Sequence, residues 1–308
     1  MPRPTSVSNA HVLASVPLSR LATLGAALQL PLGRLLETVS GFPAELSRMA
    51  AAIVSADFDR IRVVTVTDAK EPVVARMIEL AGSIDRDQPR RLDELIGQAE
   101  RIALTVGTVA GRTDALTLAI DGWGRRSLDE DLESLARVSR APAAELDRLG
   151  QVARPLAADG VAAVGDQVDG DGKPSWNLRL RHRNSDDQQR SQTRARLDGA
   201  AEMLGISTAQ RNLVAGLHDV LCRGRDSWSR LQLDGERLQP TLAVLWSDVP
   251  WEHAVRILIG LVADEGATRR LGAVAGAADT EMAAQLELEL RPDDPPRMNV
   301  TVDLGKGS

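Results

Sequence analysis

Hydrophobic and polar residues alternate along short stretches of this chain, and the stretches come in pairs separated by turn-forming residues. Alternation with a period of two is typical of β-strands, and strands joined by short turns must be antiparallel. The pattern predicts four β-hairpins, formed by residues 102–109 with 115–121, 160–168 with 175–183, 227–234 with 241–247, and 284–291 with 297–304.

Helical periodicity fills the segments between these hairpins. The predicted helices span residues 127–140, 143–152, 192–204, 208–221, 251–263 and 268–278. The first of them opens with Ser127 and has Glu130 three residues later, which is a capping box. An order of hairpin, helix, helix that recurs about four times predicts an α/β (α+β) protein whose helices cover one face of an antiparallel sheet.

The N-terminal part has a different pattern. Leucines recur at helical spacing through the first 55 residues, which we expect to form short helices broken by prolines. A β-branched run at 60–68 then predicts a lone strand, and 71–84 and 90–100 return to helical spacing. We therefore divide the chain into an N-terminal helical segment with one strand (1–89), packed on a main domain of repeated hairpins and helices (90–308).

Each predicted strand has an apolar face and a polar face. The apolar faces, which we expect to meet the helices, carry Trp176, Leu178, Leu180, His182, Leu286, Leu288, Leu290, Met298, Val300 and Val302. The polar faces carry Asn177, Arg179, Arg181, Arg183, Gln285, Glu287, Glu289, Asn299, Thr301 and Asp303. A polar second face fits either an open sheet or a closed barrel with a wet interior, and closure would remove the exposed strand edges. We predict one closed antiparallel barrel containing 102–122, 160–183, 227–247 and 284–304.

Composition excludes several classes of function. A net charge of −6 disfavours a general nucleic-acid binder. The single cysteine, Cys222, excludes an internal disulfide, and the four histidines are not spaced as metal ligands. No apolar run reaches the ~20 residues needed to span a bilayer, so a cytoplasmic location is expected by default.

The order of elements resembles the ABBA prenyltransferases, the PT-barrel family. The best local matches are 160–183 (GVAAVGDQVDGDGKPSWNLRLRHR) and 227–246 (SWSRLQLDGERLQPTLAVLW), and the resemblance extends over roughly residues 90–304. It implies a closed barrel ringed by helices, with an isoprenyl diphosphate and an acceptor bound inside. The chain departs from the family in having no tyrosine, and in placing Asn177, Ala243, Asn299 and Thr301 where the family commonly has lysine, arginine or tyrosine.

The resemblance suggests roles for the polar strand residues. Arg179, Arg181, Arg183 and Arg230 are candidates for binding a diphosphate, because guanidinium groups form paired hydrogen bonds with phosphate oxygens. The alternative is that these arginines pair with Glu287, Glu289, Asp303 or Asp121. The remaining candidate binding residues are Asn177, Asn299 and Trp228, although Trp228 also fits a core position.

Glu287, Glu289 and Asp303 are the candidate catalytic residues, one of which would take a proton from the acceptor. The alternative is a solvated polar strand face.

These observations predict transfer of an isoprenyl group from its diphosphate to an aromatic metabolite or a peptide side chain. A non-catalytic barrel that binds a ligand or peptide, and an interaction protein with an open polar sheet, are the alternatives. No metal ligands are expected in the chain, and Mg²⁺ would enter with a diphosphate donor. The expected partners are an isoprenyl diphosphate and an acceptor, without nucleic acid.

Overall fold

The computed structural model describes residues 10–15, 60–68, 99–109, 112–123, 127–159, 162–168, 174–234, 236–250, 252–254, 256–257 and 283–303. The strands in these ranges are β1 (Ala10–Ser15), β2 (Arg60–Asp68), β3 (Arg101–Val109), β4 (Arg112–Trp123), β5 (Ala162–Val168), β6 (Pro174–His182), β7 (Ser227–Asp234), β8 (Arg237–Pro250), β9 (Ala283–Leu290) and β10 (Arg297–Asp303). Each of the four predicted hairpins is present as an antiparallel strand pair. The strand predicted at 60–68 is β2.

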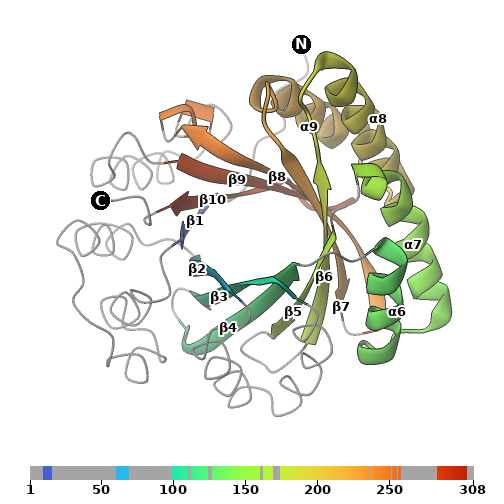
Figure 1. Ribbon diagram of the computed structural model, residues 1–308. Coiled ribbons are helices and arrows are strands. Elements are labelled where there is room, and N and C mark those ends of the chain that lie inside the picture. The colour runs from blue at the N-terminus through green and yellow to red at the C-terminus, as the bar shows by residue number, and fades with distance from the viewer. Residues whose placement is uncertain are drawn as a thin grey trace.

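These strands pair in a closed order. Neighbouring strands follow one another along the chain from β2 to β10, and all of these pairs are antiparallel. The order is completed by β1, which pairs with β10 on one side and with β2 on the other (Figure 1). Both of those pairs are parallel.

Strand β1 corrects two predictions. Residues 10–15 lie in the stretch expected to be helical, and they form a strand instead. The expectation of purely antiparallel pairing is wrong at this strand, because β1 runs parallel to both of its neighbours, β2 and β10. The rest of the N-terminal helical prediction lies outside the described residues.

The described helices are α6 (Leu128–Val138), α7 (Ala143–Leu156), the short 3₁₀ helix η1 (Ala157–Asp159), α8 (Asp187–Met203) and α9 (Thr208–Leu221). They lie outside the ring of strands, beside β5 to β8 (Figure 1), and α7 contacts β6, β7 and β8. The predicted capping box of α6 is confirmed, with Ser127 N donating to Glu130 Oε2 over 2.6 Å. The helix predicted at 268–278 and most of that at 251–263 lie outside the described residues.

The leucines on the apolar faces of β6 and β9 belong to the buried core. Leu178 is 1% exposed, and the other predicted leucines of β6 and β9 are fully buried, as expected: Leu180, Leu286, Leu288 and Leu290. Trp176 and Trp246 are the largest side chains in this core. The side chains of Val300, Thr301 and Val302 lie outside the described part of the chain. Within that part, no helix is long and apolar enough to cross a membrane.

Candidate active site

Strand pairing brings the polar residues of β6 and β7 together. Arg179 lies opposite Arg230, Asn177 lies opposite Gln232, and Arg181 lies opposite Trp228. Residues directly opposite each other on neighbouring antiparallel strands share a face of the sheet. These candidates therefore occupy one continuous surface, on the opposite side of β6 and β7 from the buried leucines.

Arg230 is the centre of a buried charged cluster on this surface. Its Nη2 donates to Glu287 Oε1 over 2.5 Å and to Glu289 Oε2 over 3.3 Å. Its Nη1 donates to Asn177 Oδ1 over 3.2 Å and to Gln232 Oε1 over 3.4 Å. The side chains of Arg230 and Glu287 are only 7% and 8% exposed. The expectation of a solvated face is wrong for this pair, and the ion-pair alternative for Arg230 is correct.

Ala243 explains how Arg230 reaches two glutamates that are two strands away. On β8, Ala243 lies opposite Arg230 on one side and opposite Glu289 on the other. Ala243 is fully buried. Its side chain is a single methyl group, so it does not compete with the Arg230 guanidinium for the space above β8. The alanine that departs from the family pattern is therefore the residue that permits the ion pair.

We expect Ala243→Leu to separate Arg230 from Glu289 and to lower the free energy of unfolding by about 1–3 kcal/mol, as overpacked sites commonly do. Urea denaturation would measure the change. Ala243→Ser, which adds only one atom, is the matched control and should retain the pairing. An Ala243→Leu variant as stable as the wild type would show that this position does not limit the approach of the two strands' side chains.

The charges continue from the cluster towards the turn between β9 and β10. Arg291 Nη2 lies 3.0 Å from Glu289 Oε1, and Asp294 lies within 3.7 Å of both Arg291 and Arg297. The side chains become more exposed along this path, from 12% at Glu289 to 37% at Arg291. The sequence analysis did not name Gln232 and Arg291 as site residues, although each is a polar residue next to a buried leucine in the alternating pattern.

A second ion pair lies at the other end of β6. Arg181 Nε donates to Asp226 Oδ2 over 2.8 Å, and Arg181 Nη2 contacts the same oxygen. The guanidinium carbon of Arg181 lies 5.8 Å from the ring centroid of Trp228, a cation–π distance. Trp228 is therefore a half-buried platform for Arg181, and Asp226 is a functional candidate that the sequence analysis missed.

The remaining predicted site residues are less closely associated with the Arg230 cluster and the Arg181–Asp226 pair. Strand β6 ends at His182, so Arg183 lies beyond it and is exposed. Asn299 lies opposite Glu287 in the β9–β10 pair. Asp303 lies opposite Ser15 of β1, four residues beyond Asn299 and therefore about 13 Å further along β10. The side chains of Asn299 and Asp303 lie outside the described part of the chain.

The carboxylates of the cluster are less available to a metal ion because they are paired with arginines. Glu287 and Glu289 are both bonded to arginines, and a cation would have to compete with those guanidinium groups. Among the described residues, no group of three or more His, Cys, Asp and Glu side chains is arranged to hold a metal ion.

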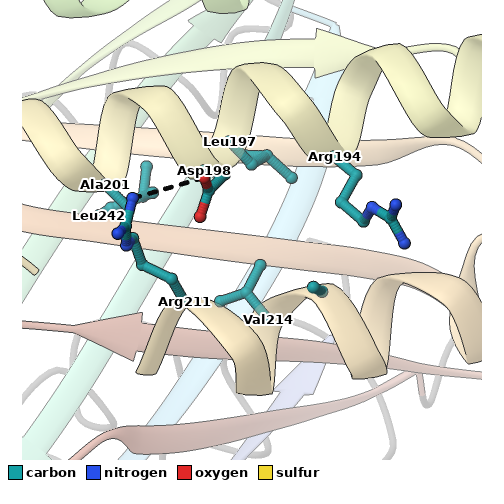
Figure 2. Close-up of a pocket in the computed structure, with 8 residues that line it drawn as sticks. Arg194, Leu197, Asp198, Ala201, Arg211, Val214 and Leu242 are labelled. Carbon is teal, nitrogen blue, oxygen red and sulfur yellow. Dashed lines mark hydrogen bonds and ion pairs between the residues drawn. The ribbon is translucent and has the colours of Figure 1, made fainter. Parts of the chain in front are cut away.

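A hollow between α8 and α9 lies on the outer side of the sheet, away from the charged cluster. Figure 2 shows it between the two helices, with Arg211 bonded to Asp198 across it. Leu242 of β8 lines the hollow together with apolar side chains of both helices. It has room for about one water molecule, so we interpret it as imperfect helix packing.

His218 and Cys222 form a second buried pair of titratable groups, at the end of α9. Cys222 Sγ lies 3.1 Å from His218 Nδ1, and both residues are fully buried. Burial lowers the pKa of His218 to about 4 and raises the pKa of Cys222 to about 12. Both groups are therefore neutral near pH 7.

The comparisons with known proteins identify the fold. No protein-family model and no curated protein sequence matches this chain. The crystal structure of 5-dimethylallyltryptophan synthase from Streptomyces coelicolor is similar, with a TM-score of 0.51 and 12% identity over 92% of this chain and 96% of that chain. The same enzyme in complex with DMASPP and Trp gives a TM-score of 0.50 at 13% identity, over 92% and 94% of the two chains.

The chain thus has a mixed fold of helices and antiparallel strands that is similar to the fold of a prenyltransferase. The similarity extends over most of both chains. At 12–13% identity, it describes the fold alone.

Proposed function

We propose that this protein is a prenyltransferase-like enzyme that moves an isoprenyl group from its diphosphate to an aromatic acceptor. The ten strands would enclose the two substrates, with the face that carries Arg230 and Glu287 turned towards them. The structural neighbour complexed with DMASPP and Trp supports this pair of substrate classes, a prenyl diphosphate and an aromatic compound.

In the proposed reaction, the bond between the prenyl carbon and the diphosphate oxygen breaks, and the electron pair stays on the diphosphate. A carbon of the acceptor ring then bonds to the allylic cation, and the ring loses a proton to regain aromaticity. Fixed positive charge is needed where the leaving group develops negative charge. Arg179 and Arg181, on one face of β6, are the proposed diphosphate contacts, and Glu287 is the proposed proton acceptor.

The buried Arg230–Glu287–Glu289 cluster is the observation that carries this proposal. Burying ionised groups costs free energy that pairing often does no more than offset, so a purely structural sheet gains little stability from such a cluster. Buried carboxylates and guanidiniums on one strand face are the groups that proton transfer and anion binding require. Their chemistry, not the similarity of fold, is the reason for proposing catalysis.

A non-catalytic ligand-binding protein is the second candidate. Two glutamates already neutralise Arg230, which reduces the positive charge available to a diphosphate. The chain also contains no tyrosine to shield a carbocation. A protein of this kind would bind a prenyl diphosphate or an aromatic ligand without forming product.

The test is an assay of wild-type protein with dimethylallyl, geranyl and farnesyl diphosphates and a panel of indole and phenol acceptors, read by mass spectrometry. We expect Arg179→Gln to lower kcat/KM by about 10- to 100-fold, the usual effect of losing a charge-assisted hydrogen bond. Arg183→Gln is the matched control, because Arg183 is exposed and lies beyond the strand, and it should change kcat/KM less than threefold.

Circular dichroism of both variants would check the fold. Wild-type protein that binds prenyl diphosphates in calorimetry but forms no product would leave the binding protein as the function. Wild-type protein that binds none of them at millimolar concentration would contradict both candidates. Equal effects of Arg179→Gln and Arg183→Gln would remove Arg179 from the site.

A further inference from the structure

We propose that Asp226 is an internal counter-ion that occupies the Arg181 guanidinium and weakens the binding of phosphate-containing anions at this end of the strand ring. This inference rests on the proposed function only for the identity of the natural ligand. The Asp226 carboxylate and an incoming anion would compete for the same arginine, Arg181.

The geometry places the carboxylate where a phosphate oxygen would bind. Two nitrogens of Arg181, Nε and Nη2, converge on a single oxygen of Asp226, and this edge of a guanidinium group is also able to donate to phosphate oxygens. Trp228 lies beside the guanidinium and limits the directions it can take. Arg181 is therefore already oriented as an anion-binding group.

The position of Asp226 is built into the fold. Asn184, two residues beyond the end of β6, donates through Nδ2 to Arg225 O over 3.1 Å and to Ser227 Oγ over 3.0 Å. Asn184 is fully buried, so it ties the segment before β7 to the end of β6. Gly224 has a φ of 68°, a left-handed conformation that glycine adopts without strain, and it turns the chain into this segment. Asp226 is thus held beside Arg181 by the backbone.

The ion pair is open enough to exchange. The side chains of Arg181 and Asp226 are 37% and 34% exposed, so water and solutes reach both. Exposed ion pairs contribute little net free energy, and a diphosphate carries more negative charge than one carboxylate. Displacing Asp226 is therefore feasible, and its negative charge remains close enough to oppose the bound anion.

The surrounding charge also favours an anion. Residues 179–183 and 222–226 contain five arginines and one acid, Asp226, in a chain with a net charge of −6. The acids that follow β6 are engaged elsewhere: Asp186 accepts from Gln189 N, and Asp187 pairs with Arg190. The helix dipole also favours arginines just after the end of α9, so the proposal rests on Arg181 and Asp226 and not on Arg223 or Arg225.

The experiment is calorimetric titration of inorganic diphosphate into wild-type protein, Asp226→Asn, Arg181→Gln and the double variant. We expect Asp226→Asn to bind diphosphate about three- to tenfold more tightly, because the substitution keeps the size of the side chain and removes its charge. The gain should disappear in the double variant. Asp219→Asn is the matched control, because it removes an exposed acid paired with Arg194, and it should change the affinity less than twofold.

An unchanged or weakened affinity in Asp226→Asn, or an equal gain in Asp219→Asn, would overturn the proposal. Asp226→Ser serves as a second uncharged variant, and if both substitutions unfold the protein, Asp226 is a structural clamp and the proposal is wrong. Prenyl transfer is assayed separately. A tighter diphosphate complex in Asp226→Asn without any prenyl transfer would support the counter-ion and reject the proposed function.

Discussion

Arg230→Met is expected to lower the free energy of unfolding by about 3–5 kcal/mol at neutral pH, as the loss of one partner from a buried ion pair commonly does. Methionine fills much of the volume of arginine but leaves the Glu287 carboxylate, which is 8% exposed, without its 2.5 Å partner. Glu287 is closer to Arg230 and more buried than Glu289, so Glu287 would be the main source of the loss. Urea denaturation followed by circular dichroism would measure it.

The double variant Arg230→Met with Glu287→Gln separates pairing from packing. Removing both charges should restore most of the lost stability, because replacing a buried ion pair by uncharged groups is often nearly neutral. Glu287→Gln alone should cost less than Arg230→Met, since Arg230 still has Glu289, Asn177 and Gln232 as partners. If Arg230→Met is as stable as the wild type, the cluster does not exist as a buried ion pair in solution.

The sequence predicts the hairpins and helices well because their signals are local. Alternation between Leu178, Leu180 and the arginines beside them determines which side of β6 is buried. Helix α9 was predicted with its observed bounds, and Ser207 caps it by accepting a hydrogen bond from Gln210 N. Strand β1 could not be predicted in this way, since six residues of AHVLAS carry little periodicity and its partners are β2 and β10.

The site is less predictable because its contacts join distant parts of the chain. Arg230 and Glu287 are 57 residues apart, and their pairing depends on the register of β7, β8 and β9 and on the small side chain of Ala243. The sequence showed on which face of its strand each residue lies, but not which residues of neighbouring strands lie opposite each other. For the same reason Asp303 was grouped with Glu287 and Glu289, although the register places it further along β10.

His218 gives the stability of the protein an expected dependence on pH. Burial lowers its pKa in the folded protein from 6.5 to about 4, because the fully buried ring loses hydration that its charged form needs. Above pH 6.5 the ring is neutral in both the folded and unfolded states and has no effect. Between pH 6.5 and pH 4 only the unfolded state takes up the proton, so stability falls as the pH is lowered. The accumulated loss is about 3 kcal/mol near pH 4 and does not grow below it.

His218→Gln removes the titrating group, so the free energy of unfolding should fall less steeply between pH 6.5 and pH 4 in the variant than in the wild type. The quantity to compare is the difference in free energy of unfolding between the wild type and His218→Gln at each pH, because the carboxylates contribute equally to both proteins. His253→Gln is the matched control, since His253 is an exposed histidine, and its pH profile should follow that of the wild type. Parallel profiles for wild type and His218→Gln would mean that His218 takes up its proton in the folded state, and that the end of α9 opens to water before the rest of the protein unfolds.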